Sequence, residues 1–184
     1  TITVHEVNAS PEFKYPIEDQ TIDELVSFSW NFKATDPDRP TQPISYSAEN
    51  LPEGATFNAS TAAFTWTPSE AQGPGEYTIT IKACDNFAPP ACATATFTLT
   101  VNEVNLAPQI YPVIDDMEVD ELDTIDFAVP AIDKDIPANV LTISIIDPPD
   151  GAEIVEGRFV WTPSEAQGPG EYDITIQVCD DADP

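Results

Sequence analysis

Basic residues are rare in this sequence: six Lys and Arg stand against 33 Asp and Glu, which gives a formal net charge of −27. A nucleic-acid partner is excluded on this ground, because binding a phosphate backbone requires a basic surface. The same charge disfavours an anionic membrane surface. No apolar run approaches the roughly 18 residues that a membrane-spanning helix requires, so we expect no membrane insertion.

Catalytic side chains are also scarce. His5 is the one histidine, and the sequence has no nucleophile elbow, phosphate loop or Cys/His metal cluster. Carboxylate pairs can hydrolyse glycosides, but no spacing here marks one acid and one base. We therefore predict that the protein is not an enzyme.

Glycine is sparse at 7 residues, whereas proline is abundant at 19, and 41% of the chain is apolar. The apolar content is too high for a disordered chain, and the prolines punctuate short segments as in all-β proteins. Apolar and polar residues alternate, with many β-branched and aromatic residues, in the segments 76–84, 95–101, 140–146 and 171–179. This alternation predicts strands.

The sequence also repeats itself. The residues WTPSEAQGPGEY occur at 66–77 and again at 161–172. The match extends outward, because TITVHEVN at 1–8 resembles TLTVNEVN at 98–105. The chain therefore holds an internal repeat of about 95 residues, present twice.

About seven short strands per repeat predict an immunoglobulin-like β-sandwich. We expect a first repeat at 9–104 and an incomplete second repeat at 105–184, after an N-terminal strand at 1–8. The duplicated tryptophans and tyrosines are interpreted as core and corner residues, with sugar stacking as the alternative. They are Trp66, Trp161, Tyr77 and Tyr172.

The repeats are out of frame with the chain, which begins without Met and without a signal peptide, so we expect a segment of something longer. The second sandwich lacks the counterpart of residues 91–101, its final strand, which leaves an unpaired edge. Either the chain belongs to a continuous array, or the N-terminal strand of another copy fills the gap. In the second case Ile2 and Val4 would take the places in the second repeat that Leu99 and Val101 take in the first, and the protein would form a head-to-tail homopolymer.

A family resemblance rests on LPEGATF at 51–57, on FTWTPSEAQGPGEYTITIKACD at 64–85 and on FTLTVNEVNLAP at 97–108. These segments resemble the cadherin-like, immunoglobulin-like (dystroglycan-type) tandem repeats of microbial surface proteins. The resemblance covers nearly the whole chain. It implies two tandem cadherin-like sandwiches that act as a stalk, an adhesion module or a carbohydrate-binding module.

Calcium is the cofactor that this resemblance implies, because calcium prefers carboxylate, amide and carbonyl oxygens. The linker EVNLAP lacks the full run of acids and amides of cadherins, and WTPSE replaces their Leu-Asp-Arg-Glu element. Solvated carboxylates therefore stay the alternative. The site between the repeats would use Glu103, Asn105, Asp133, Asp135 and Asp180, with Glu24 and Glu70 as further candidates and Asp36, Asp38 and Asp85 as the counterparts at the first repeat.

Covalent modification is indicated at four positions. Cys84 and Cys92 bracket the short loop CDNFAPPAC, which predicts a disulfide and an oxidising compartment. Cys179 corresponds to Cys84, but this sequence holds no cysteine that corresponds to Cys92 in the second repeat, so we expect Cys179 to be either unpaired or bonded to another chain. The sequons at Asn8 and Asn58 predict N-linked glycans.

From these features we predict a structural subunit of a secreted or surface fibre, or an adhesin stalk. The alternative is a carbohydrate-binding module, for which exposed aromatic residues would form a platform that binds glycans. The candidates for such a platform are Phe13, Tyr15, Phe87 and Tyr111.

Overall fold

The computed structural model of the protein describes residues 1–182, so the last two positions of the expected second repeat, 183 and 184, lie outside the described residues. The predicted all-β fold is confirmed: the described residues form strands and one short 3-10 helix, with no α-helix. The chain divides into two compact units, Thr1–Val104 and Asn105–Pro184.

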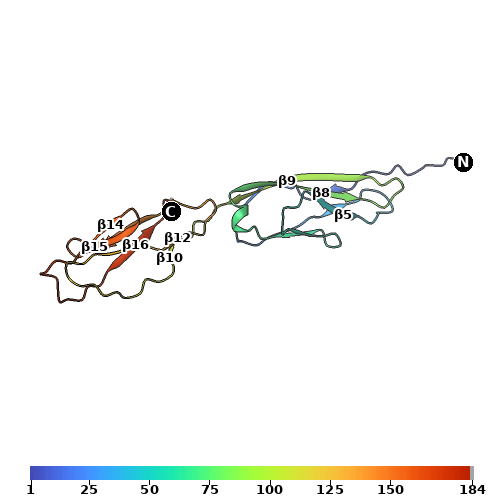
Figure 1. Ribbon diagram of the computed structural model, residues 1–184. Coiled ribbons are helices and arrows are strands. Elements are labelled where there is room, and N and C mark those ends of the chain that lie inside the picture. Colours follow the sequence, from blue (N-terminus) through green and yellow to red (C-terminus); the bar gives the residue numbers. More distant parts are fainter. Residues whose placement is uncertain (183–184) are drawn as a thin grey trace. The chain divides into compact units, whose positions relative to one another are not determined.

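Two facing sheets make up most of the first unit. A four-stranded sheet has the order β2-β9-β8-β5, and a three-stranded sheet has the order β3-β7-β6. Figure 1 shows β5, β8 and β9 side by side. The strands and the 3-10 helix are β1 (Glu12–Phe13), β2 (Gln20–Asp23), β3 (Phe28–Asn31), β4 (Ala34–Thr35), β5 (Ser45–Glu49), β6 (Thr56–Asn58), β7 (Ala63–Trp66), η1 (Glu70–Gln72), β8 (Gly75–Cys84) and β9 (Cys92–Asn102).

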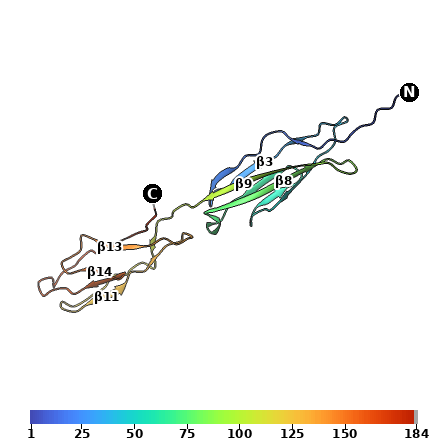
Figure 2. The same cartoon turned by 90° about the horizontal axis from the view of Figure 1, so that it is seen from above.

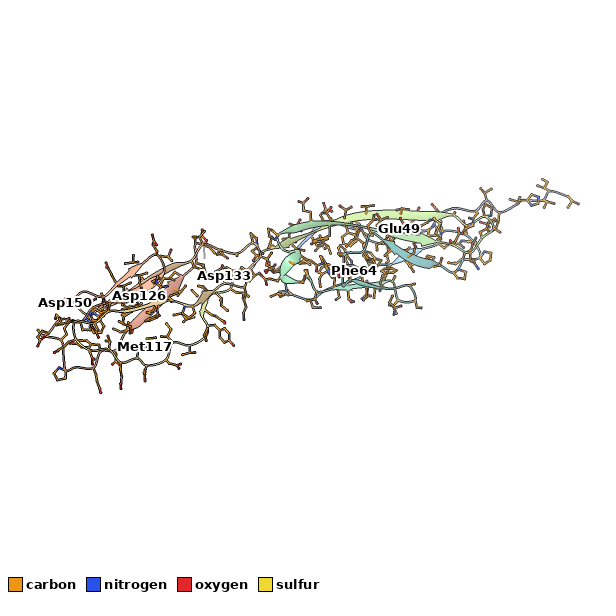
Figure 3. The ribbon with its side chains drawn as sticks, viewed as in Figure 1. Glu49, Phe64, Met117, Asp126, Asp133 and Asp150 are labelled. Carbon is orange, nitrogen blue, oxygen red and sulfur yellow. A yellow bond between two sulfur atoms is a disulfide. The ribbon has the colours of Figure 1, made fainter. Side chains whose placement is uncertain are left out.

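The alternation seen in the sequence builds the core of this unit. On β8, Ile79 and Ile81 are fully buried, whereas the intervening Thr80 lies on the outer face. From the other sheet, Phe64 of β7 fills the interior (Figure 3), and its ring meets Phe97 of β9 edge-on at 6.3 Å between centroids. Burying such aromatic side chains supplies much of the driving force for folding.

Strand β9 holds the four-stranded sheet together. It pairs antiparallel with β8 from Cys84↔Cys92 to Gly75↔Val101, and parallel with β2 from Gln20↔Leu99 to Asp23↔Asn102. The long strands β8 and β9 run along the first unit (Figure 2). Strand β2 pairs with β9 alone, so its place in the sheet depends on β9.

The second unit repeats this plan with fewer and shorter strands. It has a three-stranded sheet β11-β15-β14, a pair β13-β16 and a small ladder β10-β12. Phe159 and Trp161 are its largest buried side chains. The strands are β10 (Gln109–Ile110), β11 (Ile125–Ala128), β12 (Ala131–Ile132), β13 (Thr142–Ile146), β14 (Glu153–Val155), β15 (Arg158–Trp161) and β16 (Thr175–Cys179).

One sequence prediction fails in this unit: residues 171–174 do not belong to a strand, although their counterparts 76–79 lie in β8. The cause is the missing partner. In the first unit β5 pairs only with residues 80–84, and β9 alone pairs with 75–79. Among residues 1–182, no strand occupies the β9 position beside β16. Residues 117–120, the counterparts of β2, form no strand for the same reason.

Residues 1–8 also differ from the expected strand. They form no strand in the structure, so His5 is not a strand residue, and Ile2 and Val4 are 92% and 89% exposed. A strand exists only when its backbone groups find a partner. Residues 1–8 have the side-chain pattern of β9, but they have no neighbouring strand with which to form backbone hydrogen bonds.

Candidate metal centres

Three glutamates gather at one end of the first unit. Glu24 follows β2, Glu70 begins η1 and Glu103 follows β9, and each offers an oxygen within 4.8 Å of the other two. We call this group the Glu cluster. Glu24 is only 1% exposed; its Oε1 accepts the Val104 backbone N–H at 3.2 Å, and its Oε2 is buried without a hydrogen-bond partner.

The duplicated motif WTPSEAQGPGEY builds the wall of the Glu cluster. The Ser69 backbone N–H donates to Gln72 Oε1 at 2.8 Å, and the Tyr77 hydroxyl donates to the Gln72 carbonyl at 2.9 Å. Gly73 lies so close to Glu24 that a Cβ at this position would collide with Glu24 Oε2. The motif is thus a corner that presents Glu70 and leaves room for Glu24.

The second unit reproduces this corner. The Ser164 backbone N–H donates to Gln167 Oε1 at 2.7 Å, and the Tyr172 hydroxyl donates to the Gln167 carbonyl at 3.0 Å. Gly168 lies against the carboxylate of Glu121, as Gly73 lies against that of Glu24. The side-chain contacts of this corner therefore recur in both repeats.

Three aspartates form a second group in the first unit, near its N-terminal segment. Asp36 and Asp38 follow β4, Asp85 follows β8, and one oxygen of each lies within 4.8 Å of the others. We call this group the Asp cluster. All three are buried, and Asp36 Oδ2 has no hydrogen-bond partner. The Asp38 backbone N–H donates to Asp36 Oδ1 at 2.9 Å, which folds the Asp-x-Asp turn onto itself.

Asn8 and the loop after β8 fix Asp85. The Asn8 side-chain amide donates to Asp85 Oδ2 at 2.9 Å, and the backbone N–H groups of Ala91 and Phe87 donate to Oδ1 at 3.0 and 3.1 Å. Burial raises the pKa of Asp85, but these hydrogen bonds from Asn8, Ala91 and Phe87 outweigh it, so the pKa lies below its ordinary value. The carboxylate is therefore held in its charged form.

Glu24 and the Asp cluster carry buried negative charge. In the described residues no salt bridge joins Glu24 or an aspartate of the Asp cluster to a basic side chain. Uncompensated charges that are buried close together repel each other and lose hydration. Both clusters therefore suit a bound cation.

In each repeat, one amide side chain after the Asp-x-Asp turn was not predicted from the sequence. The Gln42 side-chain amide donates to Asn8 Oδ1 at 2.9 Å and to Asp38 Oδ2 at 3.3 Å, and its Oε1 is buried without a partner. Asn139, at the corresponding position in the second unit, also has a buried Oδ1 without a partner. The detectable sign was an amide four residues after the Asp-x-Asp turn in both repeats.

The acids of the second unit are arranged in the same way but less tightly. The Asp135 backbone N–H donates to Asp133 Oδ1 at 2.8 Å, and the Asn105 side chain donates to Asp180 Oδ2 at 3.2 Å. Asp133 lies at the end of this unit remote from Asp150 (Figure 3). In the described part of the chain, groups of three carboxylates whose oxygens lie within 4.8 Å of one another occur in the first unit alone. A site that joins Glu103 to Asn105, Asp133, Asp135 and Asp180 stays a prediction.

The predicted disulfide is present: it joins Cys84, the last residue of β8, to Cys92, the first residue of β9. Cys179 is an exposed free cysteine. Of the two sequons, Asn58 is the exposed last residue of β6, whereas Asn8 is half-buried beside the Asp cluster.

The aromatic residues considered for sugar binding come from different parts of the two units. Phe13 is partly buried against the core, and with Tyr15 it borders a shallow pocket beside Trp30. Phe87 borders a different groove, together with Arg39. Tyr111 belongs to the second unit. Of the four candidates, Phe13 and Tyr15 therefore border a common pocket, and the carbohydrate-binding alternative stays a prediction.

Comparison with known proteins gives a family and a fold. Residues 10–102 match the family described as "Putative Ig domain". No curated protein matches the chain. The described residues contain no helix long and apolar enough to cross a membrane.

Several solved structures of cadherin repeats resemble the chain in fold. Drosophila N-cadherin EC1-4 has a TM-score of 0.59 at 15% identity, covering 95% of this chain and 46% of its own. Human CDH23 EC21-23 has a TM-score of 0.57 at 18% identity, covering 95% and 64%. The extracellular cadherin domains 3-6 of protocadherin gamma B2 have a TM-score of 0.54 at 16% identity, covering 92% and 43%. The chain thus spans less than two thirds of each of these structures.

Proposed function

The chain belongs to the "Putative Ig domain" family, and from that premise we propose that it is a structural segment of an extracellular fibre or adhesin stalk that binds calcium at its acidic clusters. The disulfide supports an oxidising, extracellular location. The fold shared with extracellular cadherin domains supports the same location. The proposed role is mechanical and involves no catalysis.

The observation that carries the calcium proposal is the pair of unpartnered buried oxygens, Glu24 Oε2 and Asp36 Oδ2, each inside a cluster of three carboxylates. The possible metal ligands around them are carboxylate and amide oxygens, and neither cluster contains a histidine or a thiol. Calcium favours such sets, whereas zinc favours nitrogen and sulfur ligands. Glu24, Glu70 and Glu103 would hold one ion, and Asp36, Asp38 and Asp85 with Gln42 would hold another.

A bound cation would stabilise the ends of the first unit by joining segments that are distant in sequence. The Glu cluster brings together the ends of β2 and β9 and the helix η1. The Asp cluster brings together the segments after β4 and β8, with Asn8 beside them. An ion that binds the folded state alone raises its stability by mass action.

Calcium titration of chelator-treated protein tests this proposal. We expect binding in the range of extracellular calcium modules, roughly 0.1–1 mM or tighter, with a rise in Tm. Glu24→Gln and Asp36→Asn should each remove one class of site. Glu49→Gln, which removes the same charge from an exposed position on β5 (Figure 3), should change neither. A chain that binds no calcium at millimolar concentration contradicts the proposal.

For assembly, we propose that residues 170–173, which lead into β16, bind the segment TITVHEV of a second copy in the manner of β9. Next to this segment, Ile174 and Ile176 are only partly buried, whereas their counterparts Ile79 and Ile81 are fully buried beside β9. Ile2 and Val4 are exposed and match Leu99 and Val101, which are 0% and 1% exposed.

The pairing of β9 with β8 in the first unit gives the register expected for this contact. Leu99 pairs with Tyr77, and Val101 pairs with Gly75. At the corresponding positions Ile2 would pair with Tyr172, and Val4 with Gly170. Such contacts are head-to-tail and produce a filament rather than a closed dimer.

Light scattering on paired variants tests the assembly. Ile2→Asp/Val4→Asp places charges on the inward face and should leave monomers, whereas Thr1→Asp/Thr3→Asp places the same charges on the outward face and should leave polymers. If the unmodified chain is monomeric at high concentration, strand exchange is wrong, and a continuous repeat array is the better account.

A further inference from the structure

The loop that carries Asp85 is closed by a covalent bond as well as by hydrogen bonds. Asp85 directly follows Cys84, and Ala91 directly precedes Cys92. Between the two cysteines, the Asp85 backbone N–H donates to the Ala91 carbonyl at 3.1 Å, while the Ala91 N–H donates to Asp85 Oδ1 at 3.0 Å. The disulfide therefore lies at the neck of the loop. Cys84 is adjacent in sequence to the proposed ligand Asp85, and Cys92 is adjacent to Ala91, whose N–H donates to Asp85.

The rest of this loop offers little to hold it. Residues 86–90 are exposed, and Phe87, its largest apolar side chain, is 43% exposed. Asp85 itself is 3% exposed and faces Asn8 and the other aspartates. Nothing in the apolar core anchors the loop, so its conformation depends on the neck and on the hydrogen bonds to Asp85.

We propose that the Cys84–Cys92 disulfide is a positioning element of the Asp cluster and makes cation binding at this cluster depend on the redox state of the two cysteines. The inference rests on the proposed calcium binding. A ligand that is already held in place binds without a further loss of conformational entropy. Opening the neck would let Asp85 and the Ala91 N–H separate, so cation binding would have to restore their order.

The redox step is an ordinary thiol–disulfide exchange. A dithiol reductant attacks one sulfur, forms a mixed disulfide and then closes to its own cyclic disulfide. Two electrons and two protons pass to the protein, and Cys84 and Cys92 become thiols. Reoxidation by a disulfide of suitable potential reverses the step.

The Glu cluster provides an internal control. Cys92 begins β9 and Glu103 follows its last residue, so the 11-residue strand separates the disulfide from the Glu cluster. At about 3.3 Å per residue this separation is on the order of 35 Å. Reduction should therefore weaken cation binding at the Asp cluster and leave the Glu cluster unchanged.

Calcium titration calorimetry on the full chain, with Cys179→Ser in every variant to prevent cross-linking, tests the inference. In the Glu24→Gln background the remaining site is the Asp cluster, and in the Asp36→Asn background it is the Glu cluster. Each background is measured oxidised, after dithiol treatment, and as Cys84→Ser/Cys92→Ser, with circular dichroism to verify the fold. We expect about a tenfold loss of affinity in the first background, comparable to the loss of a residue that orients a metal ligand, and no change in the second.

Two results overturn the inference. An unchanged affinity of the Asp cluster after reduction shows that the loop holds Asp85 without the disulfide. An equal loss at both clusters shows a general destabilisation rather than positioning. Failure of the proposed function looks different, because the oxidised chain then binds no calcium at either cluster.

Discussion

Gly73 lies directly against the carboxylate of Glu24: a Cβ at this position would collide with Glu24 Oε2 and would lie 3.0 Å from the Asn102 carbonyl. The contact joins the duplicated motif to the Glu cluster. It explains why the turn needs glycine although its φ of −104° suits any residue. The requirement is space for a carboxylate rather than backbone freedom.

Gly73→Ala should therefore displace Glu24 and abolish calcium binding at the Glu cluster. We also expect a stability loss of roughly 1–3 kcal/mol from overpacking. Gly54→Ala is the matched control, because Gly54 has a φ of +79° but no atom within 4 Å of an added Cβ. The control should lose stability through backbone strain and keep its calcium affinity. Calorimetry and urea unfolding together separate the two effects.

The two corner tyrosines should differ in their contribution to stability. Tyr77→Phe removes the hydrogen bond to the half-buried Gln72 and should cost about 0.5–1.5 kcal/mol. Tyr172→Phe removes the same bond in the second unit, but Tyr172 is 42% exposed, so water can replace the lost hydroxyl. Urea unfolding of both variants measures the difference. Equal losses would show that exposure at the second corner has no energetic effect.

Hydrogen exchange should distinguish two segments of nearly the same sequence. Residues 76–79 pair with β9 and should be protected, whereas 171–174 lie outside any strand and should exchange rapidly. Adding the peptide TITVHEV should slow exchange at 171–174, and the same peptide with Asp at its second and fourth positions should not. Strong protection of 171–174 without peptide would mean that this segment already has a partner strand.

The two sequons should also behave differently in a host that adds N-linked glycans. Asn58 is exposed and uses its Oδ1 to accept the backbone N–H groups of Ser60 and Thr61, which leaves its amide nitrogen toward solvent. The Asn8 amide nitrogen donates to Asp85, so a glycan there would disrupt the Asp cluster. We expect the glycan mass to disappear in Asn58→Gln and to persist in Asn8→Gln. Occupancy of Asn8 in a calcium-binding chain would contradict this assignment.

Much of the candidate site could be predicted because calcium chemistry restricts residue types. An Asp-x-Asp turn and an acid at a strand end predict Asp36, Asp38 and Asp85 as ligands, and the structure brings the three together. The sequence favours Glu24 less strongly, yet it is the most buried acid of the chain's described part. Its burial depends on Gly73 and on the β2–β9 pairing, which link residues about 50 to 80 positions away in sequence.

Gln42 shows the limit of this reasoning. An amide in a proline-rich loop is ordinary in sequence, and nothing nearby requires it to face the aspartates. In the structure its side chain donates to Asn8 and Asp38, and its Oε1 is buried without a partner. The role comes from the folding of the loop over the cluster rather than from residue type.

The sequence by itself determined the repeat, the strand alternation, the corner motif and the disulfide, because each depends on residues that are near neighbours in the chain or on a periodic pattern. The tertiary structure decided which carboxylates meet and which strands exist. Glu-Tyr at 76–77 lies in a strand, and Glu-Tyr at 171–172 does not. The local sequence is the same, but the first pair has β9 beside it, and a backbone ladder forms only where a second strand supplies its donors and acceptors.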